Sequence, residues 1–361
     1  MFSQNDKISI RQLQTLLILD VFGTGVIILP RIAAQYAAQD GWIVIIFVTL
    51  LACLQVFLIT TLAKMFPNDS FLTYCSKIVS RPLAFLISAG FIVKIIITIA
   101  LELRFFGEII KQTLLYHTPL YVVFIAMVMV CGYVAAKGIE ARARTGELLL
   151  PVLLIPIVFV FVLASFNVSF SNLQPVFSAT PGEIAEAVYY CGYSYSGIEF
   201  LLLVFPYLNN PKRARKASLH AVLFIGLLMI LITVVTIAQF GPVDVIRQQW
   251  PVLSMMSLID FPGAFIERQD ALIMSFWIIS VFAIVNAGMF FAAAQLKDIV
   301  QKGRLSVYIL CLIPPVALVS FYPNNMAQVF DLMQKTFFTF GLAYMMLIPL
   351  VLLVIAKIRG L

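Results

Sequence analysis

Three charged residues within strongly apolar stretches are the first candidates for chemistry. Asp20, Lys94 and Glu199 each lie in an apolar run long enough to cross a bilayer. A charge at the centre of a membrane helix costs about 2.5–3.5 kcal/mol on insertion scales, so such residues usually pair with one another or mark a functional site. The three lie at comparable depth when counted from the same membrane face, which predicts an ion pair or triad. Its role is either to couple to a proton or a conformational change, or only to fix helix register.

Two interruptions that contain glycine fall in the middle of apolar runs. The first is "VFGTGVIILP", from Val21 to Pro30, and the second is "CGYSYSGIEF", from Cys191 to Phe200. An unpaired backbone N–H or C=O group in hydrocarbon costs several kcal/mol, so a break there indicates a ligand site or a tight contact. Because glycines also permit close packing of membrane helices, a packing role is the alternative.

Unwinding at the first interruption would create groups that suit the two ends of an amino acid. A half-helix that starts near Val26 presents free N–H groups and the positive end of its dipole to a carboxylate. The carbonyl groups of residues 20–22, with those near Tyr195, suit an ammonium group. Backbone atoms at the two interruptions are therefore expected to hold a small zwitterion.

Polar side chains in other runs extend this expectation. Thr98 and Glu102 follow Lys94 at four-residue spacing, which places them on about the same face of a helix. Asn286 offers an amide to a cavity, although polar residues also hold membrane helices together. The predicted ligand-binding residues are Phe22, Gly23, Thr24, Gly25, Val26, Thr98, Glu102, Tyr193, Tyr195, Ser196, Gly197 and Asn286.

The sequence carries no pattern typical of catalysis or of a bound cofactor. It contains no phosphate-binding loop and no recognisable pairing of a nucleophile with a base. The five cysteines lie mostly in apolar runs and show neither CxxC nor HxxxH spacing, which argues against a disulfide framework and a metal site. We therefore expect no enzyme activity, no cofactor and no metal.

The composition is that of a polytopic membrane protein whose spans are all helical. The 361 residues are 62% hydrophobic and 11% charged, whereas globular domains are about 45–50% apolar and about 25% charged. A spanning helix needs about 20 mostly apolar residues, and the runs here are continuous rather than alternating. Ten spans are expected, at Leu13–Ala34, Trp42–Met65, Leu83–Leu114, Tyr121–Ala136, Leu148–Ser165, Ala185–Leu208, Ala217–Phe240, Ala271–Leu296, Leu305–Phe321 and Phe337–Ala356.

The two interruptions suggest an internal repeat within one membrane domain, residues 1–361. Gly25 and Gly197 are separated by 172 positions, close to half of the chain. Corresponding interrupted spans in two halves are typical of inverted-repeat transporters and point to their binding site. We expect five-helix repeats at residues 13–165 and 185–356, with the first and sixth helices broken at mid-membrane. Short helices are expected in two connections, one at Phe66 to Arg81, capped by Asn68, Asp69 or Ser70, and one at Gly241 to Arg268.

The distribution of positive charge predicts the orientation. Of the 24 Lys and Arg residues, 17 fall on the side that also carries both termini, including Lys137, Arg142 and Arg144, and five fall on the other. Lys94 and Arg104 lie inside the third span. The positive-inside rule then places both termini in the cytoplasm. The run "PKRARK" is interpreted as an anchor near anionic membrane lipid, and no nucleic-acid partner is expected.

Several motifs resemble known families. The stretches "GTGVIILP" and "SYSGIEF" resemble the substrate motifs of the amino acid/polyamine/organocation transporter superfamily, which has the LeuT-like fold, although Thr24 and Ile198 depart from that pattern. The stretches "KISIRQLQTLLIL", "AKMFP", "KGIEARARTGELLLPV" and "NLQPVF" are similar to the endospore germination receptor B-subunit family. This second similarity spans nearly the whole chain.

The resemblance implies a nutrient-sensing subunit of the spore inner membrane. Its partners would be an A subunit and a lipoprotein C subunit, and its ligand a small germinant such as an amino acid. The alternative is an autonomous amino acid transporter coupled to protons through Glu102, Glu199 or Lys94. A membrane scaffold without a working site is the third hypothesis.

Overall fold

The computed structural model describes residues 6–23, 25–165, 168–257 and 269–361, and every regular element within these ranges is a helix. Five helical stretches among them are long and apolar enough to cross a membrane, and three shorter apolar helices accompany them. This arrangement fits the expected polytopic, all-helical membrane protein. The five long stretches are Gly25–Met65, Arg81–Thr113, Pro211–Phe240, Trp277–Val300 and Met326–Ile358.

Regular helix stops and restarts at the first glycine interruption. Helix α1 (Ile10–Val21) begins with a capping box, in which the Ser9 hydroxyl accepts from the Gln12 N–H at 3.2 Å and the Gln12 side chain accepts from the Ser9 N–H at 2.9 Å. The helix ends at Val21, and α2 (Gly25–Ala37) begins four residues later. Because Asp20 and Val21 are buried, the end of α1 lies inside the protein rather than at its surface.

The second interruption consists of short turns between two helical pieces. Helix α8 (Pro181–Cys191) is followed by the 3₁₀ turns η3 (Gly192–Tyr195) and η4 (Ile198–Phe200), by α9 (Leu201–Val204) and by the 3₁₀ turn η5 (Phe205–Tyr207). Gly197, between η3 and η4, has a φ of +114°, in a region that residues with a Cβ rarely adopt. The main chain changes direction at this glycine.

Both predicted connecting regions contain short helices. Helix α4 (Phe71–Ile78) is capped by Ser70, whose hydroxyl accepts from the Thr73 N–H at 3.4 Å. Helices α11 (Pro242–Arg247) and α12 (Pro251–Ser257) lie in the second connection, and residues 258–268 of it fall outside the described residues. The short helices and the cap at Ser70 are confirmed.

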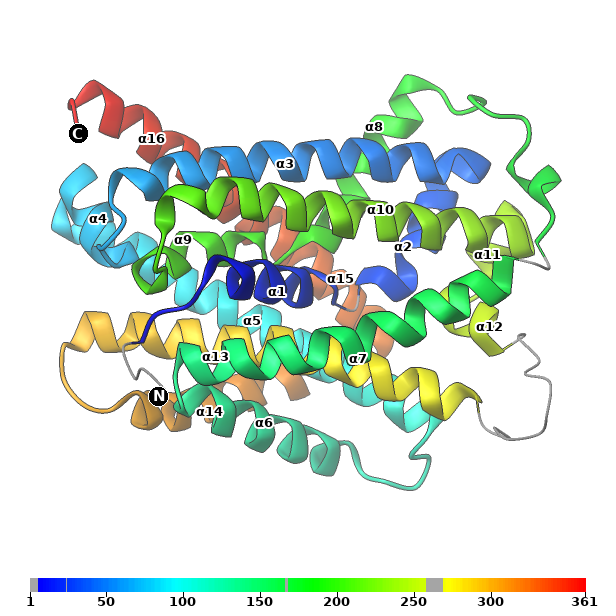
Figure 1. Cartoon of the computed structure of the whole chain (residues 1–361). Coiled ribbons are helices and arrows are strands. Elements are labelled where there is room, and N and C mark those ends of the chain that lie inside the picture. The colour runs from blue at the N-terminus through cyan, green and yellow to red at the C-terminus, as the bar shows by residue number, and fades with distance from the viewer. Residues whose placement is uncertain (1–5, 24, 166–167, 258–268) are drawn as a thin grey trace.

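The remaining helices surround the two interrupted segments. Helix α1 packs against α7, α10 and α13, and α2 packs against α8, α3 and α12. Figure 1 shows the long helices running alongside one another, with α4 and the end of α16 toward one end of the bundle and α11 and α12 toward the other. The remaining elements are η1 (Ala38–Asp40), α3 (Gly41–Met65), α5 (Arg81–Thr113), α6 (Leu120–Ala136), α7 (Ile139–Ser165), η2 (Phe170–Leu173), η6 (Pro211–Arg213), α10 (Ala214–Phe240), α13 (Gln269–Val300), α14 (Leu305–Phe321), α15 (Met326–Thr336), the π-helical turns η7 (Phe337–Gly341) and η8 (Ala343–Leu347), and α16 (Ile348–Ile358).

Candidate functional site

The two interrupted segments pack directly on each other through their glycines. A Cβ atom added to Gly25 would lie 3.0 Å from the Cα of Ser194, and one added to Gly197 would lie 2.7 Å from the backbone oxygen of Asp20. Real Cβ atoms do not approach other atoms so closely without displacement. The absence of side chains at these two positions therefore allows segments far apart in the sequence to touch near the centre of the bundle.

A buried ion pair joins the second interruption to α5. The Lys94 ammonium donates a hydrogen bond to a Glu199 carboxylate oxygen, and the two side chains are only 2% and 1% exposed. Glu199 also accepts from the Gly197 N–H at 2.8 Å and from the Ser196 hydroxyl at 3.4 Å. The charge on Glu199 is thus balanced by a cation and by the backbone of the turn that precedes it, as a buried carboxylate requires.

A second buried ion pair holds the end of α1, and it differs from the expected triad. Asp20 pairs with Arg142 rather than with Lys94, and the Arg142 guanidinium also lies 5.5 Å from the ring centre of Phe291. Arg142 precedes the expected fifth span, but α7 already begins at Ile139 and buries this side chain in the bundle. Since Gly197 packs on the backbone of Asp20, the two ion pairs flank the same contact.

Tyr195 faces α3 through a short hydrogen-bond chain. Its hydroxyl lies 2.6 Å from the Thr49 hydroxyl, which donates to the Ile45 carbonyl at 2.7 Å. The Tyr195 hydroxyl is therefore the donor to Thr49, because the Thr49 proton is already used. With 1% of its surface exposed, Tyr195 anchors η3 to α3 in this conformation.

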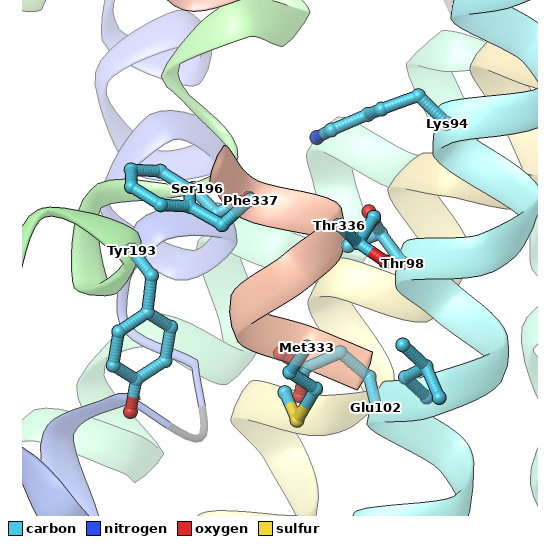
Figure 2. A pocket seen from close by; sticks show the side chains of 9 residues that line it. Lys94, Thr98, Glu102, Tyr193, Ser196, Met333, Thr336 and Phe337 are labelled. Carbon is cyan, nitrogen blue, oxygen red and sulfur yellow. The ribbon is translucent and has the colours of Figure 1, made fainter. Parts of the chain in front are cut away.

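A small cavity lies between η3, α5 and the end of α15, and Figure 2 shows the side chains that line it. Its volume is about 30 Å³, room for roughly two water molecules, since one needs about 10–15 Å³ by the same measure. Lys94, Thr98 and Glu102 line it from successive turns of α5. The other lining residues are Leu101, Tyr193, Ser196, Met333, Thr336 and Phe337.

The cavity unites five of the residues singled out from the sequence, namely Lys94, Thr98, Glu102, Tyr193 and Ser196. The Tyr193 hydroxyl is buried and makes no hydrogen bond of good geometry within the described part of the chain. Sequence reasoning missed Leu101, Met333, Thr336 and Phe337. No signal marks them, because methionine, leucine and phenylalanine occur throughout the apolar runs.

Other predicted ligand residues lie elsewhere. Phe22 and Val26 line a separate, apolar cavity of about 40 Å³, and the Val26 N–H donates to the Gly23 carbonyl at 3.4 Å. The Asn286 side chain donates to the Cys131 carbonyl at 2.8 Å and so links α13 to α6. Thr24 lies outside the described residues. The described residues contain no cluster of three or more His, Cys, Asp or Glu that could hold a metal.

A family model described as spore germination protein matches residues 7–329 of this chain. The chain belongs to this family. The similarity to germination receptor B subunits inferred from the sequence motifs is confirmed at this level. Family membership and the long apolar helices together indicate an integral membrane protein.

Individual relatives cover most or nearly all of the chain. It is 26% identical over 360 residues to spore germination protein YndE of Bacillus subtilis strain 168, covering 99% of both chains. It is 26% identical to spore germination protein GerLB of Bacillus cereus over 94% of this chain and 91% of the relative. Spore germination protein KB of Bacillus subtilis strain 168 is 28% identical over 76% of this chain and 74% of its own.

Proposed function

We propose that this chain is the germinant-sensing subunit of a spore germination receptor. It binds a small ligand resembling an amino acid beside the second interrupted helix and signals to partner subunits by changing conformation. The partners are the A subunit and the lipoprotein C subunit, and the complex resides in the spore inner membrane. The chain crosses this membrane ten times as a LeuT-like pair of inverted five-helix repeats, with both termini in the cytoplasm.

The cavity beside η3 is the observation that carries this proposal. It gathers an ammonium group, a carboxylate and several hydroxyl groups, mainly from α5 and the second interruption. Glu102 can accept from a ligand amine, and the hydroxyl groups of Thr98 and Tyr193 can donate to a ligand carboxylate. These groups match the features shared by all amino acids, so they support the ligand class without selecting one member.

The size of the cavity implies that ligand entry moves α15. A volume of about 30 Å³ is far below the roughly 300–1,000 Å³ typical of small-molecule pockets. Met333 and Thr336 of α15, with Phe337 of η7, form the wall opposite α5. The turns η7 and η8 that follow are π-helical, a geometry often found at functional sites. We propose that this wall swings away when the ligand binds.

The ion pair beside the cavity gives the ligand a way to favour one conformation. A ligand carboxylate that reaches Lys94 competes with Glu199 and weakens the link between α5 and the second interruption. A ligand shifts such an equilibrium only by its difference in affinity for the two states. Partner subunits would respond to the resulting movement of the segment around Gly197.

Binding to the purified full chain in lipid nanodiscs tests the location of the site. Labelled amino acids are screened individually, and Glu102→Gln is compared with Glu108→Gln, which changes a carboxylate on the same helix that pairs with Arg104 at 2.8 Å. We expect Glu102→Gln to weaken binding by about tenfold or more, the loss of one charged hydrogen bond, and Glu108→Gln to leave it near wild type. Equal affinities of the two variants for the ligand would show that it does not bind in this cavity.

The alternative, an autonomous proton-coupled amino acid transporter, is favoured by one observation. The buried Lys94–Glu199 pair borders the cavity, and buried titratable pairs occur along proton pathways. Uptake of a labelled amino acid by the chain alone in liposomes, driven by a pH gradient, supports the transporter. Binding without uptake supports the receptor subunit.

A further inference from the structure

A second, larger hollow lies on the membrane-facing side of α6, away from the polar cavity. Its volume is about 690 Å³, and it is bounded by α5, α6, α7 and α13. Sixteen side chains line it, and all are apolar except Thr118 and Thr145. Neither the expected germinant nor the ion pairs involve this groove, so a molecule bound in it would be independent of the proposed function.

The groove opens toward hydrocarbon. Its deeper residues Phe106, Val123 and Met127 are at most 8% exposed, whereas Val122 and Val130 at its rim are 42% and 56% exposed. The rim continues into an apolar face of α6 that is also exposed. In a membrane-spanning chain such a face meets lipid tails rather than water.

The groove runs along nearly the whole of α6. Its α6 residues extend from Val122 to Val134, a helical rise of about 18 Å at 1.5 Å per residue, and Leu114, Leu115 and Thr118 continue the lining beyond the start of this helix. An extended acyl chain entering from one membrane surface would lie along this path.

The shape of the lining favours a flexible chain over a partner helix. Membrane helices pack through small residues that let their backbones approach, and only Thr118, Ala126 and Thr145 of the sixteen lining residues are small. Gly132 of α6 instead faces Ile309 and Met289 within the bundle. A helix is about 10–12 Å wide with its side chains and would rest on bulky branched residues here.

The positively charged Lys137 lies at one end of the groove. Lys137 directly follows α6, three residues after Val134, and it is exposed. Its ammonium lies 5.2 Å from the ring centre of Tyr133, and no salt bridge to it occurs in the described residues. Thr145 lines the groove at the same end. Arg144 pairs with Glu140 at 3.1 Å, and Asp6 lies beside Gly138, so Lys137 is the cation assigned to an anionic headgroup.

We propose that the groove binds one acyl chain of an anionic membrane phospholipid, with the phosphate of its headgroup at Lys137. Phe106 and Ile110 line the groove from α5, the helix that carries Lys94 and Glu102 toward the polar cavity. The bound lipid therefore packs against the same helix as the proposed ligand, though in a separate site.

Native mass spectrometry of the purified full chain tests this binding. The probe is an equimolar mixture of phosphatidylglycerol and phosphatidylcholine with identical acyl chains. We expect one retained phosphatidylglycerol per chain. Retention of no phospholipid, or equal retention of the two kinds, would overturn the assignment of an anionic lipid.

Matched substitutions locate the bound chain. Ala126→Phe fills the groove, whereas Ile125→Phe adds its ring one position away on the exposed face. We expect Ala126→Phe to weaken lipid binding by about tenfold, the loss expected when two methylene groups lose their burial, and Ile125→Phe to bind as wild type. If Ala126→Phe does not fold, Val130→Phe at the exposed rim replaces it. Equal binding by the groove variant and its control would overturn the proposal.

The headgroup assignment has its own control. Lys137→Gln removes the cation at the proposed end, and Lys111→Gln removes one near the opposite end, close to Leu114. We expect Lys137→Gln to abolish the preference for phosphatidylglycerol and Lys111→Gln to retain it. The reverse result would overturn the placement of the headgroup.

Discussion

Removing the cation of the Lys94–Glu199 pair should destabilise the protein far more than removing an exposed cation. In Lys94→Met the Glu199 carboxylate, 1% exposed, loses its counter-charge, and breaking a buried pair from one side costs about 3–5 kcal/mol. The matched control is Lys77→Met. Lys77 pairs with Asp69 at 2.6 Å with 50% of its side chain exposed, and such pairs contribute about 0–1 kcal/mol.

The double variant Lys94→Met/Glu199→Gln separates charge from packing. It removes both charges while the amide keeps the shape of the glutamate, so most of the lost stability should return, because a buried pair and a neutral replacement of similar volume are often nearly equal in stability. The assay is thermal unfolding of purified protein in one detergent, with protein abundance in membranes as a second readout. If Lys94→Met melts as Lys77→Met does, the pair is not held in a dry interior and the expected cost is refuted.

Three further predictions concern the turn at Gly197, the loop at residues 177–179 and the start of α8. Gly197→Ala should reduce the yield of folded protein, because a positive φ costs a residue with a Cβ about 1–2 kcal/mol and the added Cβ would meet the Asp20 backbone. The control is Gly182→Ala, whose added Cβ meets no atom within 4 Å and should leave the yield unchanged. Equal yields of the two variants would contradict this prediction. Asp40→Ala should speed proteolysis of the loop at residues 177–179. The three backbone N–H groups of this loop donate to the buried Asp40 carboxylate at 2.6–2.9 Å, and each such bond is worth about 1.5–3 kcal/mol. An unchanged rate of cleavage would refute this prediction. Hydrogen bonds from Thr180 hold the pKa of Glu183 below its ordinary value of 4.5, so this carboxylate stabilises the start of α8 above that pH and loses the contribution as pH falls through its lowered pKa. Amide exchange in α8 should therefore be faster in Glu183→Gln than in wild type at neutral pH and should converge in acid, and a constant difference would contradict this pH dependence.

The sequence was sufficient for elements that local rules determine. Continuous apolar runs predict long helices such as α3, α5 and α10, whereas α15 lies outside the predicted spans. Ser70 is one of the three cap candidates that the sequence offers, because a short side-chain oxygen before a helix satisfies its first N–H groups. Glycines in the sequence also indicate both interruptions. At Gly197 the reason is steric, because only a residue without a Cβ fits against the Asp20 carbonyl.

Choices between partners could not be predicted from the sequence. Asp20 could meet either Lys94 or Arg142, and the outcome depends on how α7 packs beside α1 and on the ring of Phe291. The contribution of Met333 and Phe337 to the cavity wall could not be predicted for the same reason. The packing of α15 against α5 determines which apolar side chains face the polar ones.

The most direct test of the ligand site is a structure of the full chain in nanodiscs with an amino acid that the binding screen identifies. We expect ligand density between Thr98 and Tyr193, with Met333 and Phe337 displaced from their positions in Figure 2. Ligand density elsewhere, with the wall of α15 unmoved, would contradict the proposed site.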